Sequence, residues 1–380
     1  MMEVADRLHS VQEYYFSKKL KEVYALQAAG KPIINLGIGS PDLQPPSQVV
    51  KALTESITHP TAHKYQSYQG LPELRQAIAD FYKEHYYTHI NPDAEVLPLM
   101  GSKEGIMHIS LAFLNQGDGV LIPNPGYPTY AAVTKLVQAN PITYNLDSSN
   151  NWLPNIAELE QQDLSKVKLM WISYPHMPTG AKATRSDFEQ LVAFAKKHDI
   201  LLVNDNPYSF ILNETPLSIL SVKGAKEVCL ELNSLSKTFN MAGWRVGMVL
   251  GSSQHIQAIL KVKSNMDSGM FYGIQKGAIE ALKCSKLWYS SLNSIYEKRR
   301  QLVWQLATKL NCTFSKEASG LFVWAKVPEG ETSEAFIDAL LIEKSVFITP
   351  GIIFGTQGEG YVRFSLCASE EDIEEAIARV

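Results

Sequence analysis

The chain has 380 residues, of which 45% are hydrophobic and 19% are charged, a composition typical of globular proteins. A net charge of −4 and an isoelectric point of about 6.2 disfavour nucleic acid or an anionic membrane as a partner. No apolar run approaches the ~20 residues that span a bilayer. Because MMEVADRLHSVQEYYFSKKL is charged early and has no long apolar stretch, we expect no secretory signal and a cytoplasmic protein.

The number and spacing of the cysteines agree with a cytoplasmic protein. The four cysteines lie far apart in the sequence and form no CxxC pair; they are Cys229, Cys284, Cys312 and Cys367. This spacing favours reduced structural thiols over a disulfide framework or a zinc site. We therefore expect no bound metal.

Short apolar runs alternate with amphipathic stretches through the middle of the chain. The runs read as buried strands at 95–100, 120–123, 167–173, 200–204, 228–233 and 247–250. Between two of them, Phe188, Leu191, Val192 and Ala195 mark one face of a helix, for which Ser186 and Glu189 resemble a capping box. This alternation predicts a mostly parallel sheet covered by helices on both faces.

The pattern changes after about residue 275. Two amphipathic stretches, at 275–310 and 333–345, flank short strands at 321–327 and 361–366. We expect a large domain at 46–275 and a smaller α+β domain made of 1–45 plus 276–380.

Ligands of parallel α/β sheets bind beyond the carboxyl ends of the strands, so the residues that follow each strand are informative. The first such stretch is Gly101-Ser102-Lys103-Glu104-Gly105, which opens an apolar helix. A glycine turn before free helix N–H groups suits a phosphate. The same residues also suit an ordinary strand–turn–helix junction, and the pattern alone leaves both interpretations open.

Three further loops carry candidate side chains. Tyr127 can stack on a planar ring or be a half-buried loop aromatic, and His176 can be catalytic or only hydrogen-bonded. Asp205 can hold a protonated ring nitrogen as an ion pair, with Tyr208 placed to bond a phenolic oxygen of the same ring. An ordinary turn aspartate fits Asp205 equally well.

The stretch NSLSKTFNMAGWRVG (233–247) is the most specific. Ser234 and Ser236 supply hydroxyls, and Arg245 supplies a planar fork suited to phosphate. Lys237 can form a Schiff base, which requires an unprotonated amine; burial and nearby positive charge would lower its pKa. A plain loop lysine would leave this combination a coincidence.

At this point the chain resembles the class I/II aminotransferases, pyridoxal-phosphate enzymes of fold type I, over nearly its whole length. SLSKTFNMAGWRVG matches the family's S-x-S-K-x-x-x-x-x-G-x-R pattern. Other matching segments occur in order: IINLGIGSPD (33–42), YQSYQG (65–70), PGYPTY (125–130), DNPY (205–208), TPGIIFG (349–355) and YVRFSL (361–366). The resemblance implies a three-layer α/β/α fold with a large, mostly parallel, seven-stranded sheet and a smaller α+β domain.

The resemblance also implies roles in binding the cofactor, pyridoxal 5′-phosphate. Lys237 would carry it as a Schiff base and move a proton. Asp205 would pair with the ring nitrogen, Tyr208 would bond the ring hydroxyl, and Tyr127 would stack on the ring. The phosphate would be held by Ser102, the Lys103 backbone, Ser234, Ser236 and Arg245.

For the substrate, the resemblance implies that Arg363 clamps the α-carboxylate with help from the Gly39 N–H; otherwise Arg363 is an arginine in an edge strand. Tyr65 would reach into the partner subunit's phosphate site, so we expect a homodimer. Segments GSKEGI, DNPY and SNMDSGMF lean towards the LL-diaminopimelate aminotransferase and broad-range subgroup, in which Tyr14 would close over the substrate.

One position departs from the family pattern. Met177 stands before Pro-Thr-Gly where the family usually has an asparagine that bonds the ring hydroxyl. A thioether donates no hydrogen bond, so we expect Tyr208 alone to support that hydroxyl.

The expected reaction is transfer of the α-amino group of an L-amino acid to a 2-oxoacid such as 2-oxoglutarate. A C–S lyase or a γ-eliminating synthase would use the same anchoring residues. A non-catalytic sensor domain of a transcription regulator is disfavoured, because only about 30 residues precede IINLGIGSPD and the chain is acidic. A nicotinamide dehydrogenase is disfavoured because no GxGxxG follows a strand.

Overall fold

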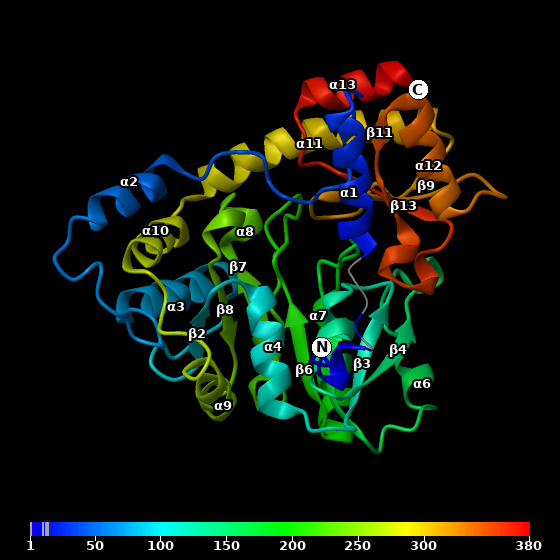
Figure 1. Cartoon of the computed structure of the whole chain (residues 1–380). Helices are drawn as coiled ribbons and strands as arrows, with labels where there is room; N and C mark the ends of the chain where they lie inside the picture. Colours follow the sequence, from blue (N-terminus) through cyan, green and yellow to red (C-terminus); the bar gives the residue numbers. More distant parts are fainter. Residues whose placement is uncertain (1, 10, 12–14) are drawn as a thin grey trace.

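The structure is a computed structural model that describes residues 2–9, 11 and 15–380, except the side chains of 15–17. Figure 1 shows a large sheet with helices around it and a smaller group of elements at one end, where α1 lies beside the C-terminal helices α12 and α13. Helix α1 (Tyr15–Ala28) is therefore close in space to the C-terminal part of the chain, whereas the turn Asp6–Leu8 contacts α5 (Thr129–Leu136) of the large unit.

The large sheet has seven strands in the order β2-β8-β7-β6-β5-β3-β4, in which only β8 runs antiparallel to its neighbours. Its strands are β2 (Val96–Leu99), β3 (Gly119–Asn124), β4 (Asn140–Asn145), β5 (Val167–Ile172), β6 (Leu201–Asp205), β7 (Cys229–Ser234) and β8 (Gly247–Leu250). The expected mostly parallel seven-stranded sheet is confirmed. β4 was not predicted from the sequence, because most of its side chains are exposed or half-buried and form no apolar run.

Side chains of each central strand enter two separate cores. In β5, Leu169 and Trp171 join the core beneath α4, α5 and α9, whereas Met170 and Ile172 join the core beneath α3, α7 and α10. This alternation is the period of two that a strand buried on both faces requires. It builds the expected three layers. The helices of these layers are α2 (Ser47–Ser56), α3 (Pro72–Tyr86), α4 (Ser102–Phe113), α5 (Thr129–Leu136), α6 (Ile156–Leu159), α7 (Arg185–His198), α9 (Ser253–Lys263) and α10 (Tyr272–Leu282).

Helix α7 buries Phe188, Leu191, Val192 and Ala195, as the spacing predicts. The predicted capping box is wrong by two residues. Thr184 is the N-cap, its hydroxyl accepts from the Asp187 N–H, and the Asp187 carboxylate accepts from the Thr184 N–H. Aspartate in place of the expected glutamate completes the reciprocal pair.

The predicted stretch 275–310 is two helices, α10 and the long α11 (Lys286–Lys309). α11 crosses between the cores: Tyr289 packs in the large core, and Leu292 and Tyr296 pack in the C-terminal one.

The C-terminal part contains a four-stranded antiparallel sheet in the order β12-β13-β10-β9. Near it, β1 (Ile34–Asn35) pairs in parallel with β11 (Val346–Phe347), which fastens the N-terminal segment to this unit. The other elements here are α1 (Tyr15–Ala28), β9 (Thr313–Phe314), β10 (Phe322–Lys326), α12 (Ser333–Lys344), β12 (Thr349–Pro350), β13 (Tyr361–Ser365) and α13 (Glu370–Arg379). The division at 45/46 and 275/276 stays a prediction.

Strand directions decide where a ligand can bind. β2, β3, β5, β6 and β7 all end at the same edge of the large sheet, and antiparallel β8 begins there. The loops singled out from the sequence therefore meet at this edge. In the described ranges, no helix combines the length and the apolar character that crossing a membrane requires.

Candidate active site

A cavity of about 390 Å³ lies at that edge of the sheet, a size in the range of small-molecule sites. Twelve of the residues that the sequence singles out line it: Gly39, Ser102, Lys103, Tyr127, Met177, Asp205, Tyr208, Ser234, Ser236, Lys237, Arg245 and Arg363. They come from segments up to several hundred residues apart in the sequence, and the strand ends bring them together.

Lys237 lies in the short helix α8 (Leu235–Thr238), which follows β7 directly. Its Nζ donates to the carbonyl of Gly39 at 2.5 Å. Burial lowers the pKa of Lys237; Cys367 opposes this, and the positive charges of Arg363 and Arg245 add to the lowering. The amine is thus closer to its unprotonated, nucleophilic form than an exposed lysine.

Asp205 is the last residue of β6 and is 6% exposed. Oδ2 accepts a hydrogen bond from the Tyr130 hydroxyl at 2.9 Å, whereas Oδ1 is buried without a hydrogen-bond partner in the protein. Burial raises the pKa of Asp205 to about 6, against the lowering effect of Tyr130. A buried carboxylate oxygen left open at a cavity suits a protonated nitrogen of a ligand.

The start of α4 is built for an anion. Gly101 is its N-cap with φ +93°, and no side chain caps the first N–H groups. A Cβ at Gly101 would lie 2.2 Å from Nη2 of Arg245. The guanidinium therefore packs directly on the main chain of Gly101. Free helix N–H groups, the hydroxyls of Ser234 and Ser236, and this guanidinium together offer a phosphate-binding set.

Arg363 lies in β13, between β12 and β10, so the alternative of an edge-strand arginine is wrong. Its guanidinium carbon is 4.0 Å from the ring centroid of Phe322 and 4.8 Å from that of Phe354. Nη2 donates to the Gly37 carbonyl at 2.9 Å, and Nη1 lies 3.6 Å from the sulfur of Met177. The two rings hold the planar fork in a fixed orientation, which bidentate carboxylate binding needs.

The family model for "Aminotransferase class I and II" matches residues 31–380. The chain belongs to the class I and II aminotransferases.

Full-length relatives of this aminotransferase carry one repeated name. An LL-diaminopimelate aminotransferase of Dehalococcoides mccartyi is 40% identical over 381 residues, covering 100% of this chain and 98% of the relative. One of Aquifex aeolicus is 38% identical over 382 residues, covering 100% and 99%. Among solved structures, substrate-bound BacF of Bacillus subtilis has a TM-score of 0.96 at 37% identity, covering 100% of this chain and 97% of BacF.

The cofactor of this family, pyridoxal 5′-phosphate, fits the residues present. Its acidic tail matches the uncapped start of α4 and Arg245, and its ring nitrogen matches the open Oδ1 of Asp205. Its aldehyde needs an amine of lowered pKa, and Lys237 supplies one in the same cavity. The fold type I architecture expected from the sequence is confirmed, and the aminotransferase is a pyridoxal-phosphate enzyme.

Two candidates of the sequence do not line the cavity, and a third cannot be placed. Tyr65 is 91% exposed and does not line the cavity. Tyr14 lies outside the described residues. His176 is buried, its Nδ1 is 2.9 Å from the Thr179 hydroxyl, and burial lowers its pKa to about 3. This histidine is neutral and does not line the cavity, which fits the hydrogen-bonded alternative.

Sequence reasoning missed the residues that orient the others. Tyr130 closes the PGYPTY segment, but nothing in the sequence pairs it with an aspartate 75 positions away. Phe322 and Phe354 read as core residues of a strand and a turn. Met177, which the sequence singled out for a lost contact to the cofactor ring, lines the cavity, and its sulfur lies 3.6 Å from Nη1 of Arg363. The lost ring contact stays a prediction.

Proposed function

We propose that the enzyme transfers the α-amino group of an L-amino acid to a 2-oxoacid, 2-oxoglutarate in the first instance, with the cofactor attached to Lys237 as a Schiff base. The observation that carries this proposal is the buried Nζ of Lys237, of lowered pKa, in one cavity with Asp205, Arg245 and Arg363. Amino-group transfer requires a nucleophilic amine flanked by charged side chains that hold the cofactor on one side and the substrate on the other.

On the phosphate side, Ser102, the Lys103 backbone, Ser234, Ser236 and Arg245 would hold the cofactor tail. On the ring side, Tyr127 would stack on the ring and Tyr208 would donate to its hydroxyl. Burial raises the pKa of Tyr208, although Arg363 opposes this. Its hydroxyl therefore keeps its proton at neutral pH and acts as a donor.

When bound, pyridoxal phosphate supplies an aldehyde for the amino group and a ring that accepts the electrons left at Cα. Asp205 would keep the ring nitrogen protonated through its open Oδ1. Arg363, assisted by the Gly39 N–H, would fix the substrate carboxylate and thereby the direction of the Cα–H bond. Lys237 Nζ would take the Cα proton and return it. The Gly39 carbonyl, at 2.5 Å, holds that amine at the floor of the cavity.

The names of the full-length relatives put LL-diaminopimelate first among the donors to test. We further propose a cytoplasmic homodimer in which Tyr65 of one subunit enters the phosphate site of the other. The exposed Tyr65, Tyr68, Met266 and Phe271 support this, because they lie on two segments that contact each other through Gly269 and Gln66, and exposed apolar side chains that gather in this way mark an interaction surface.

Borohydride reduction tests the covalent attachment. Protein loaded with pyridoxal phosphate and reduced should gain the cofactor's mass on the peptide that contains Lys237. Lys237→Ala should abolish the labelling, whereas substitution of the exposed Lys182 should leave it intact. Labelling at any other lysine, or none in the wild type, would refute the assignment.

Single-turnover spectroscopy with LL-diaminopimelate and a panel of other L-amino acids tests the reaction. Transamination leaves the bound cofactor in its amine form, and 2-oxoglutarate then restores the starting spectrum. A C–S lyase or a γ-eliminating synthase would instead return the starting spectrum unaided and release ammonia.

A further inference from the structure

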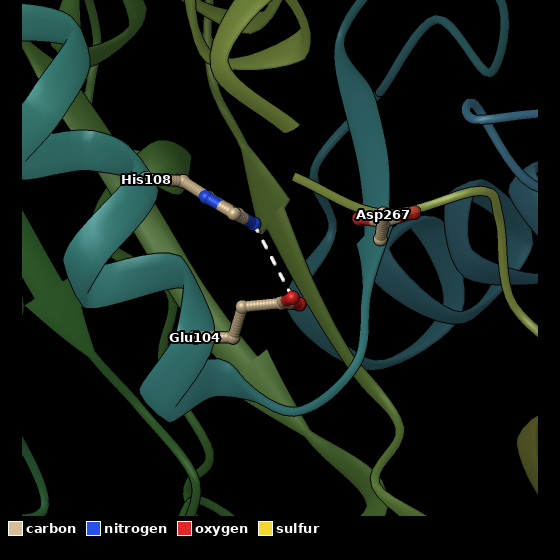
Figure 2. A group of neighbouring side chains, drawn as sticks. All are labelled: Glu104, His108 and Asp267. Atoms are coloured by element: carbon tan, nitrogen blue, oxygen red, sulfur yellow. Dashed lines mark ion pairs between the residues drawn. The ribbon is translucent and has the colours of Figure 1, made fainter. Parts of the chain in front are cut away.

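Four ionisable side chains meet beside the start of α4. Glu104 and His108 project from the same face of that helix toward a common space, and Asp267 approaches from the segment after α9 (Figure 2). Glu104 Oε1 lies 3.4 Å from His108 Nε2, and one ligand atom from each of the three residues lies within 4.8 Å of the others. The fourth member is Lys263 at the end of α9, whose Nζ is 2.8 Å from Asp267 Oδ1.

This charge cluster, defined as Glu104, His108, Lys263 and Asp267, is largely buried, and the Glu104 side chain is its most exposed member at 23%. Lys263 is 2% exposed, His108 is 1% exposed, and the Asp267 side chain is 6% exposed. Charges removed from water need partners at close range. The Lys263 ammonium lies 2.8 Å from Asp267 Oδ1, so a divalent cation there would face a like charge at short range. We therefore interpret the cluster as an internal ion network and not as a metal site.

The first carboxylate acts on the turn before α4. Glu104 Oε2 accepts the backbone N–H of Met100 at 2.8 Å, the residue directly before Gly101 and Ser102. Burial alone would raise the pKa of Glu104. The neighbouring His108, whose Nε2 is 3.4 Å away, the hydrogen bond from the Met100 N–H and the charge of Lys263 outweigh burial and lower it. Glu104 is thus a charged anchor for the phosphate-binding turn.

The second carboxylate acts on a different loop. Asp267 Oδ1 also accepts the N–H of Gly269 at 2.8 Å. Gly269 has φ +87°, and a Cβ there would lie 2.5 Å from the carbonyl oxygen of Gln66. The loop therefore rests directly on the backbone of Gln66, the neighbour of Tyr65.

We propose that the charge cluster is a positioning device that links the cofactor-phosphate turn of its own subunit to the segment carrying Tyr65, which completes the site of the partner. The inference rests on the proposed function, because it requires Tyr65 to enter the second subunit's cavity. Its new content is that the geometry of one active site depends on buried charges in the other subunit.

Hybrid dimers test this link. Two differently tagged chains are co-expressed: a silent subunit that carries Lys237→Ala and an active subunit that is wild type. In such a dimer only the active subunit attaches cofactor covalently, and Tyr65 of the silent subunit serves its cavity. The readouts are the dissociation constant of pyridoxal phosphate for the active subunit and the sedimentation coefficient of the hybrid.

Asp267→Ala in the silent subunit should weaken cofactor binding in the active subunit by about tenfold, within the range of coupling between residues of one network. Asp267→Asn keeps an oxygen for the Gly269 N–H and should recover only part of that loss, because it leaves the buried Lys263 ammonium without its carboxylate. Ser268→Ala shortens an exposed side chain of the same loop and should change nothing. Asp267→Ala moved to the active subunit should weaken binding there too, through Lys263 and Glu104.

Unchanged cofactor binding with Asp267→Ala in the silent subunit would refute the link, provided that Tyr65→Phe in that subunit weakens binding. If Tyr65→Phe also has no effect, the shared site of the proposed function fails and the inference fails with it. If Asp267→Ala prevents dimer formation, Lys263→Met/Asp267→Asn replaces it. This pair removes both charges and keeps the acceptor for Gly269, so cofactor binding in the active subunit should be weaker than in the hybrid with a wild-type cluster; unchanged binding would contradict the proposal.

Discussion

At the scale of single residues, the site holds Asp205 in a position that costs the apoprotein stability. The carboxylate is buried at the end of β6, and one hydroxyl, that of Tyr130, supports it. Its second oxygen has no hydrogen-bond partner in the protein, and burial raises the pKa of Asp205 to about 6. Asp205 is therefore suited to bind a ligand, and it lowers the stability of the protein without that ligand.

We expect Asp205→Asn to stabilise the apoprotein. The pKa of Asp205 is higher in the folded protein than in the unfolded chain. The loss of folding stability caused by its buried negative charge is therefore absent below the unfolded pKa near 4 and grows as the pH rises to about 6. Because the pKa of Asp205 is raised by about two pH units, the free energy of unfolding of the Asp205→Asn apoprotein should exceed that of the wild type by about 3 kcal/mol at pH 8. The two proteins should not differ near pH 4. Urea unfolding of apoprotein at both pH values measures this.

Cofactor binding should be strongly weakened in the same variant, since the amide carries no charge for the ring nitrogen. The exposed Asp163→Asn serves as a control that should not stabilise the protein at pH 8, because hydrogen bonds from Ser165 lower the pKa of Asp163. An Asp205→Asn apoprotein no more stable than wild type at pH 8 would contradict the prediction.

Met177 allows a second test at this scale. Met177→Asn places an amide donor where the family usually has one, and a donor to the cofactor's ring hydroxyl favours the ionised oxygen. The pH midpoint of the bound cofactor's absorption change should therefore fall. Met177→Leu keeps the apolar shape without a donor, so its midpoint should stay near that of the wild type. Equal midpoints in all three proteins would count against the prediction.

At the scale of elements, the turn between β2 and α4 combines an unusual backbone conformation with a close approach. Gly101 has φ +93°, and the Arg245 guanidinium occupies the space that a side chain would need. The helix N-terminus, the turn and the return into β8 therefore depend on one another.

Gly101→Ala should weaken cofactor binding by roughly 10- to 100-fold, the loss expected when a charged hydrogen-bonding group is displaced. Gly117→Ala is the matched control, because Gly117 has φ +88° and a Cβ added there would meet no atom within 4 Å. Both variants place a side chain at a positive φ, but only the first displaces the Arg245 guanidinium, so only the first should affect titration of apoprotein with pyridoxal phosphate. Equal losses of cofactor affinity would refute the close-contact explanation.

Elements also show what the sequence can and cannot predict. Strands such as 167–172 were predictable because they are continuous apolar runs, and Lys237 because its neighbours form a dense local pattern. β4 was missed because its side chains are largely exposed. The Asp205–Tyr130 bond, the Phe322–Arg363–Phe354 stack and the charge cluster join residues far apart in sequence, and spacing along the chain carries no signal for such contacts.

At the scale of the whole molecule, exposed apolar side chains gather on two segments that pack on each other. Tyr65 and Tyr68 lie on one, Met266 and Phe271 lie on the other, and Gly269 rests on Gln66 between them. Exposed apolar side chains grouped in this way mark an interaction surface. A second copy of the chain is the occupant that the proposed function requires.

Phe271→Glu should dissociate the dimer by placing a charge in this surface, at a cost of about 2 kcal/mol or more for a residue central to the interface. Ile342→Glu makes the same change at an exposed apolar position of α12 and should leave the dimer intact. Sedimentation velocity over a range of concentrations distinguishes the two. Unchanged association in Phe271→Glu would refute the proposed interface.

The reversed direction of β8 has a mechanical consequence. The chain leaves the sheet after β7 and re-enters through β8, and Lys237 and Arg245 both lie on that single excursion. The two strands are hydrogen-bonded neighbours, so both ends of this excursion are anchored at adjacent positions of the sheet. One connection between two paired strands thus carries both the amine and the guanidinium.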